Sequence, residues 1–238
     1  MPSQYSELHG VHIRKTIEKL CRRIHERFPG SGLGGVAAEL EQVSAENERV
    51  VSQLQKPIWW LRVLTVIAIG SLVSLFSWVA FRLATLALTG AATLSDVLQG
   101  MDAGINEVVF LTLAIAFLVS LENRIKRGKA LRILHKLRSI AHVVDMHQLT
   151  KDPEYLLYPE APLANSPERL LDRHQLVRYL DYCSELLSLT AKLAALHGQS
   201  MQDAQVLETV NDLESLASDL SRKVWQKISI LRSSGDGN

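Results

Sequence analysis

Titratable side chains recur at helical spacing between residues 124 and 145. A helix turns about 100° per residue, so residues three or four apart share one face. Six charged or titratable residues fall in one narrow arc, opposite the apolar side of the segment: Arg124, Arg127, His135, Arg138, His142 and Asp145. We call this set the basic stripe, and its chemistry admits three interpretations.

The first interpretation of the basic stripe is a solvent-exposed face of an amphipathic helix, in which Arg138 and Asp145 make local ion pairs. The second is an anion-binding site, because arginine and histidine side chains next to a membrane hold lipid headgroups, phosphates or nucleotides. The third is a metal or hydrolytic site built on His135, His142 and Asp145. Adjacent arginines disfavour the third interpretation because they repel a divalent cation, and a second helix would have to supply further ligands.

Other motifs give no support for catalysis or a cofactor. Three glycines between residues 30 and 35 match G-x-G-x-x-G, but this motif binds dinucleotides only between a strand and a helix, and a helical pattern precedes it here. We therefore expect a hinge over residues 29–35. Cys21 and Cys183 lie far apart without a base at a readable spacing, which argues against a disulfide framework and nucleophilic catalysis. We expect a non-enzymatic protein without a cofactor.

Two uncharged apolar runs indicate membrane spans. The first, residues 63–81, has 19 residues and would measure about 28 Å as a helix, close to the hydrocarbon thickness of a bilayer. The second, residues 108–121, has 14 residues. We expect spans at about 58–82 and 105–121. Residues suited to the headgroup level flank the first span, namely Trp59, Trp60 and Arg62 at one end and Trp78 and Arg82 at the other.

Small residues recur every four positions on both spans. They are Gly70 and Ser74 on the first span and Thr112, Ala116 and Ser120 on the second. Small side chains let two helices approach closely, so we expect these two stripes to pack against each other. Hydroxyl groups on the same faces also fit a pore formed by several copies of the chain.

Basic residues are distributed unequally around the two spans. Arg49, Lys56 and Arg62 precede the first span, seven basic residues lie between 124 and 138, and only Arg82 lies in between. The positive-inside rule therefore predicts that both termini are cytoplasmic, in a membrane of the bacterial inner-membrane type. The alternative is a soluble helical bundle with the two runs as its buried core.

Apolar residues in the rest of the chain recur every three or four positions, and no segment has the pattern of a strand. We expect an all-α protein in which a two-helix transmembrane hairpin carries a cytoplasmic antiparallel helical bundle with coiled-coil-like seams. The expected domains are a helical pair at 1–56, the transmembrane hairpin at 57–121, and the bundle at 122–238. A proline-rich linker at 150–167 interrupts the bundle.

Several local features follow from the same patterns. Helices are expected at about 5–28, 36–56, 122–149 and 201–232, with a further one starting near Ser166 or at Asp172. Gly198 is expected just after a helix end and Ser200 at the cap of the next helix. Asn47 lies in an apolar seam, where it either is buried and fixes the register or oligomeric state, or lies at a wet edge.

The net charge of +1 provides no field that would attract nucleic acid. The expected partners are membrane lipids, further copies of the chain, and a cytoplasmic protein or a small anionic ligand. The sequence most directly predicts a non-enzymatic interaction or signalling protein, with heptad seams that favour self-association. The alternatives are a pore-forming effector gated by a cytoplasmic ligand or partner, and a metal-dependent hydrolase on the histidine and aspartate residues of the basic stripe.

Overall fold

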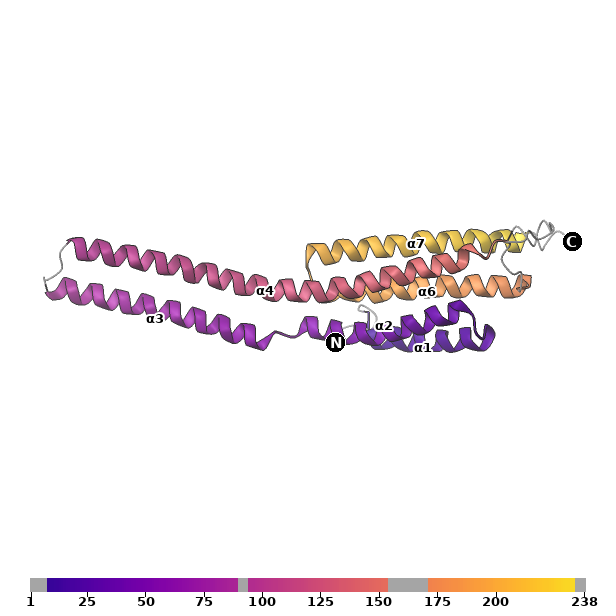
Figure 1. Cartoon of the computed structure of the whole chain (residues 1–238), viewed down its shortest axis with the longest axis horizontal. Coiled ribbons are helices and arrows are strands. Elements are labelled where there is room, and N and C mark those ends of the chain that lie inside the picture. Colours follow the sequence, from indigo (N-terminus) through magenta and orange to yellow (C-terminus); the bar gives the residue numbers. More distant parts are fainter. Residues whose placement is uncertain (1–7, 90–93, 154–170, 234–238) are drawn as a thin grey trace, which may run out of the picture. The chain divides into compact units, whose positions relative to one another are not determined.

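The computed structural model describes residues 8–89, 94–153 and 171–233, excepting the side chains of residues 83, 86–89, 94, 96, 97 and 103. No described residue is in a strand, which confirms the all-α prediction. The helices are α1 (Gly10–Arg27), α2 (Gly32–Gln55), α3 (Trp59–Thr89), α4 (Leu94–Leu149), α6 (Arg173–Ser200) and α7 (Ala204–Ser233) (Figure 1).

The chain divides into two compact units. Residues 1–55 and 129–238 form one, which contains α1, α2, α6, α7 and the second part of α4, and we call it the bundle unit. Residues 56–128 form the other, which contains α3 and the first part of α4, and we call it the apolar unit. The N-terminal helical pair is therefore part of the bundle unit, and α4 belongs to both units as one unbroken helix. The prediction that the second apolar run continues as a helix to Leu149 is confirmed.

Each helix of the bundle unit buries one apolar stripe, and α6 and α7 lie side by side (Figure 1). The predicted seams of these helices are confirmed as core. Buried positions include Leu134 and Leu137 on α4, Leu180 and Leu187 on α6, and Val210 and Leu220 on α7. Burying one such side chain stabilises the fold by about 1.5–3 kcal/mol, so these stripes supply most of the stabilisation of the bundle.

The turn between α1 and α2 is shorter than the predicted hinge at 29–35. Gly30 has φ +71°, a left-handed conformation that glycine adopts at no steric cost. The Ser31 hydroxyl then accepts a hydrogen bond from the Gly34 amide at 3.2 Å and caps α2, which begins at Gly32. The prediction of a loop over residues 32–35 is wrong, because a serine cap starts the helix four residues before the expected Val36.

One predicted boundary of α6 is confirmed, and two further boundaries change. The start of α6 at Asp172 is confirmed, since the Asp172 carboxylate accepts from the Gln175 backbone amide at 2.8 Å in a capping box. Gly198, however, lies within α6, which continues to Ser200. Asp203 rather than Ser200 caps α7, because its carboxylate accepts from the amides of residues 205 and 206. The alternative start near Ser166, and the linker from residue 154 on, lie outside the described residues.

Helices α3 and α4 are each long and apolar enough to cross a membrane. Large apolar side chains are exposed all along them, with Phe76 68% and Phe110 71% exposed. Less exposed positions recur at heptad spacing on both helices: Leu61, Thr65, Ala68, Leu72, Leu75 and Val79 on α3, and Leu111, Ile115 and Leu118 on α4. Val79 also lies 3.9 Å from where a Cβ on Gly104 would stand.

The predicted contact between the two small-residue stripes is not found within the chain. The small residues lie on the exposed sides of their helices: Gly70, Ser74, Thr112, Ala116 and Ser120. A Cβ at Gly70 would meet no atom within 4 Å. The prediction was wrong because both helices are apolar on every side, so that hydrophobicity does not select which face pairs.

A buried polar pair interrupts the apolar core of the bundle unit. The His197 imidazole on α6 donates from Nε2 to the Asn47 Oδ1 on α2 at 2.7 Å, and Asn47 Nδ2 donates to the Leu193 carbonyl at 3.4 Å. Both side chains are fully buried. Asn47 therefore lies in the seam and not at a wet edge, and the pair joins residues that are 150 positions apart in the chain.

Burial lowers the pKa of His197 from 6.5 to about 4. Among the described residues, its Nδ1 has no hydrogen-bond partner, so the environment offers nothing to stabilise a second ring proton. The folded state therefore holds a neutral imidazole over a pH range in which the unfolded chain is protonated.

Replacing Gly35 by alanine should stabilise the protein. A Cβ at Gly35 meets no atom within 4 Å, and alanine is more favourable than glycine inside a helix by about 0.5–1 kcal/mol. At Gly32 a Cβ would overlap the His147 imidazole on α4, so Gly32→Ala should give no gain. Thermal unfolding followed by circular dichroism in detergent should show a higher midpoint for Gly35→Ala only. An equal gain for Gly32→Ala would contradict the close approach of α2 and α4.

The stability of the bundle should fall as the pH decreases from 6.5 to 4. In this window the unfolded chain binds a proton at His197 that the folded chain excludes, so the stabilisation is complete above pH 6.5 and is lost as pH falls toward 4. The loss amounts to about 3 kcal/mol, at about 1.4 kcal/mol per pH unit. Urea unfolding at a series of pH values should show this dependence in the native chain and a weaker one in His197→Gln. Identical pH profiles would refute the assignment.

Candidate anion-binding site

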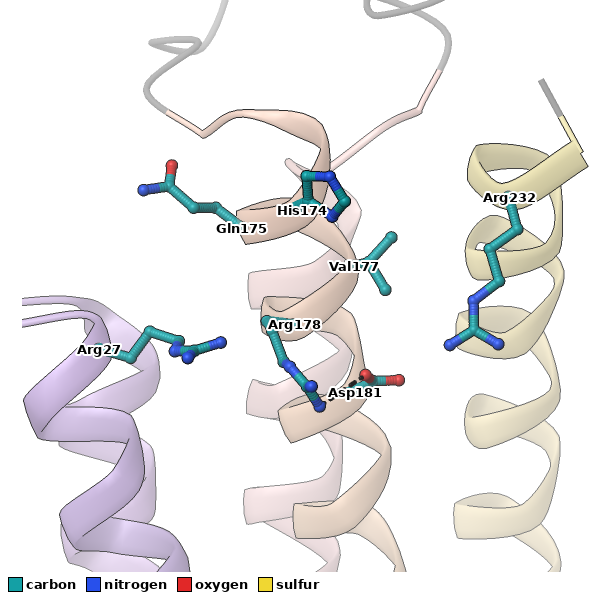
Figure 2. A pocket seen from close by; sticks show the side chains of 7 residues that line it. All are labelled: Arg27, His174, Gln175, Val177, Arg178, Asp181 and Arg232. Carbon is teal, nitrogen blue, oxygen red and sulfur yellow. Dashed lines mark ion pairs between the residues drawn. The ribbon is translucent and has the colours of Figure 1, made fainter. Parts of the chain in front are cut away.

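A pocket of about 460 Å³ opens in the bundle unit between the ends of three helices. Arg27 is the last residue of α1, and Arg232 lies in the last turn of α7. The first turns of α6 supply the remaining lining residues, His174, Gln175, Val177, Arg178 and Asp181. Figure 2 shows Arg27 and Arg232 on either side of α6, with the Arg27 side chain extending toward α6. The pocket is therefore lined by guanidinium groups from three different helices.

Aromatic contacts fix the end of α1 against α6. The Phe28 ring, which follows Arg27 directly, packs edge-on against the ring of Tyr179 with centroids 5.4 Å apart, and against Tyr182 at 6.2 Å. Arg23, one turn before Arg27, pairs with Glu185 on α6 at 2.7 Å. These contacts hold the Arg27 backbone close to α6 and so position its side chain.

A hydrogen bond fixes the end of α7 against the start of α6. The Arg173 guanidinium donates from Nε and Nη2 to the Leu231 carbonyl, with an Nε–O distance of 2.7 Å. Carbonyls in the last turn of a helix have no partner within the helix, so Arg173 also caps α7. Arg232 follows Leu231 directly, and its position at the pocket depends on this bond.

The pocket carries an excess of positive charge. Its lining has three arginines and one carboxylate, that of Asp181, which lies 3.6 Å from the Arg178 guanidinium. The formal charge of the arginines and the carboxylate together is +2. Arg27 and Arg232 lie at helix C-termini, where the helix dipole favours a cation and holds these charges in place without a ligand.

Guanidinium groups are hydrogen-bond donors only, and their planar fork fits phosphate and carboxylate oxygens in pairs. The described cysteines do not add a nucleophile, because burial raises the pKa of Cys183 to about 12 and that of Cys21, beside Glu41, to about 11. Both thiols therefore stay protonated at neutral pH. The arrangement is suited to holding an anion rather than to transforming one.

The basic stripe is divided between the two units. Arg124 and Arg127 belong to the apolar unit, and the other four residues belong to the bundle unit. His135 and His142 are exposed, and the Arg138 guanidinium lies 3.8 Å from a carboxylate on α7, that of Asp212. These positions favour the interpretation of an exposed amphipathic face, in which Arg138 pairs with a residue of another helix rather than locally.

Asp145 takes part in a polar contact between α4 and α7. Its carboxylate accepts a hydrogen bond from Gln148 Nε2 at 2.6 Å, and Lys227 on α7 donates to the Gln148 carbonyl at 2.9 Å. Burial lowers the pKa of Lys227, while the charges of Asp152 and Asp145 oppose this shift. Asp145 thus helps hold the end of α4 against α7.

No group of three or more histidine, cysteine, aspartate or glutamate side chains is arranged to hold a metal ion among the described residues. The metal interpretation of His135, His142 and Asp145 therefore finds no ligand set in this part of the chain.

The residues predicted for the membrane surface lie at exposed positions. Trp59, Trp60 and Trp78 are exposed, and the Arg82 guanidinium lies 5.7 Å from the centre of the Trp78 ring. A cation over an indole face is favourable, so the two predicted interface residues at this end of α3 contact each other. Arg62 is also exposed, in the first turns of α3.

Sequence reasoning missed the pocket because its arginines are far apart in the chain. Arg27 and Arg232 are ordinary basic residues at helix C-termini, and Arg178 follows no motif. A topological signal was present, however: if neighbouring helices are antiparallel, the end of the first helix, the start of α6 and the end of α7 meet.

Comparisons with known proteins add nothing to this geometry, since no family model, curated protein or solved structure matches the chain.

Proposed function

We propose that this chain is an integral membrane protein in which α3 and α4 form a transmembrane hairpin, both termini are cytoplasmic, and the bundle unit is a non-enzymatic interaction or signalling module. The observation that carries the proposal is the contrast between the two units. The bundle unit buries its apolar stripes, whereas the most apolar 18-residue window of each candidate span has no buried residue. Hydrocarbon is the environment in which such surfaces are stable.

Contacts within the apolar unit support the hairpin. Val79, in the C-terminal part of α3, lies next to Gly104, in the N-terminal part of α4. The Ile58 amide, just before α3, donates to the Glu122 carboxylate farther along α4 at 3.3 Å. These two contacts are those of an antiparallel pair. Glu122 also pairs with Lys126 at 2.9 Å. The charge of Glu122, at the end of the expected second span, is thus paired, and its carboxylate also accepts the hydrogen bond of the Ile58 amide.

The hydroxyl groups on α3 support membrane insertion as well. Thr65, Ser71 and Ser77 each donate to a carbonyl of their own helix four residues earlier, at 2.8, 2.9 and 2.8 Å. In hydrocarbon an unpaired polar group is strongly destabilising, and these bonds remove that penalty. The helix is therefore compatible with lipid contact on its exposed sides.

Self-association has to use other surfaces than the heptad seams that first suggested it, because those seams are buried within the bundle unit of the same chain. The exposed small residues offer a surface instead. Gly70 and Ser74 on α3, and Thr112, Ala116 and Ser120 on α4, leave room for close approach by helices of another copy. The same exposed faces favour a second candidate function, a membrane-permeabilising effector, since copies that contact there can line a pore.

Topology can be tested with introduced cysteines, because both native cysteines are buried and react slowly. Ser95 on α4 and Ser215 on α7 are exposed. If both termini are cytoplasmic, a membrane-impermeant maleimide should label Ser95→Cys in intact cells, and should label Ser215→Cys only after lysis. Labelling of both positions in intact cells, or recovery of the protein in the soluble fraction, would refute the proposal.

Self-association through the small residues can be tested by oxidative crosslinking in membranes. Ser74→Cys places a thiol on the exposed face of α3, whereas Leu72→Cys, two residues away, places one in the seam with α4. We expect disulfide-linked dimers for Ser74→Cys and few or none for Leu72→Cys. Equal crosslinking of both variants would exclude the small-residue face of α3 as the contact between copies. It would also exclude a pore lined by that face.

A further inference from the structure

We propose that the pocket at Arg27, Arg178 and Arg232 binds the phosphate group of a small phosphomonoester. The inference deepens the proposed function, on which it rests, by giving the bundle unit a ligand of stated chemistry. The starting observation is that arginines from α1, α6 and α7 line one pocket, and that contacts at the adjacent residues fix the ends of α1 and α7.

Charge is the first argument for a phosphate. Among the described residues, Asp181 is the sole carboxylate that lines the pocket, and it lies beside Arg178. No ion pair within 4.0 Å joins Arg27 or Arg232 to an acidic residue of the described chain. The formal excess of +2 matches a phosphomonoester, which carries a charge of about −1.5 to −2 at pH 7. A carboxylate would neutralise half of that excess.

Size and lining are the second argument. A pocket of about 460 Å³ falls within the usual range for small-molecule sites, about 300–1,000 Å³, and leaves room for an organic group beside the phosphate. The side-chain nitrogen of Gln175 and the His174 imidazole provide polar contacts for that group, and Val177 provides an apolar contact. Arginines of the pocket would hold the phosphate, with the remainder of the ligand along the first turns of α6.

Binding should stabilise the bundle, because the ligand would connect the ends of three helices whose like charges otherwise repel. A ligand that binds only the folded state raises stability with its concentration. The stabilisation should therefore follow the occupancy of the pocket. Phosphomonoesters come from two sources that share this chemistry, soluble metabolites and phosphorylated lipid headgroups, and the two are separated in the experiment below.

The test measures binding to the full chain in detergent and in nanodiscs. Inorganic phosphate and adenosine monophosphate serve as soluble probes, with sodium chloride at matched ionic strength as the control. Nanodiscs with phosphatidic acid are compared with phosphatidylcholine nanodiscs. We expect a higher thermal midpoint with phosphate compounds than with chloride. A shift with the soluble probes assigns a soluble ligand, and a shift with phosphatidic acid alone assigns a lipid headgroup.

Substitutions connect the effect to the pocket. Arg27→Ala and Arg232→Ala should each weaken binding by about tenfold, as expected for the loss of one charge-assisted contact. Arg222→Ala is the matched control, because Arg222 is an exposed arginine on α7 that pairs with Asp219 away from the pocket. Asp181→Asn should tighten binding, since it removes the carboxylate that competes for Arg178. This gain would distinguish ligand binding from a purely structural role of the arginines.

The absence of any phosphate-dependent shift would overturn the inference, as would equal losses in Arg27→Ala and Arg222→Ala. These readouts are independent of membrane orientation. Failure of the labelling experiment would refute the proposed topology, whereas failure here would refute the ligand, so the two proposals can be told apart.

Discussion

One helix has to meet two different environments with a single unbroken backbone. The part of α4 in the apolar unit exposes Ile105, Phe110 and Phe117, while its part in the bundle unit buries Leu134, Leu137 and Val144. An α-helix satisfies its own amides and carbonyls wherever it lies, so only side chains have to change between the two parts. The first part of α4 contacts Val79 on α3 and the Ile58 amide just before α3, whereas α2 and α7 contact the second part.

This division determines where recognition can take place in the bundle unit. Its interior is formed by apolar side chains, and the apolar seams of the helices are buried in it. Charged groups are left at the exposed faces and at the helix ends. Exposed pairs such as the one between Lys136 and Glu46, 2.6 Å apart, contribute about 0–1 kcal/mol each. At the pocket, by contrast, the charges are held without full compensation, which is the condition for binding an oppositely charged ligand.

Much of the helical framework could be predicted from the sequence because one physical signal defines it. Wherever a helix separates water from a protein core, the apolar period identifies its buried face, as on α6 and α7. The signal fails on α3 and α4, which are apolar all round, so that the small-residue stripes were assigned to the wrong contact. Helix ends were less certain, because single side chains such as Ser31 and Asp203 determine them. The pocket depends on three distant helix ends, and no local pattern contains that information.

The pair of Asn47 and His197 has a consequence for how the bundle unit chooses among alternative packings. Leucine-rich seams interlock almost equally well when one helix slides past another by seven residues, so apolar contacts alone leave several alignments close in energy. A slide of α2 by seven residues would place Leu40 or Leu54 opposite the imidazole. Two buried polar groups would then lose their partner, a penalty of about 1–3 kcal/mol for each group. A single hydrogen bond of 2.7 Å thus discriminates among alignments that the surrounding leucines cannot tell apart.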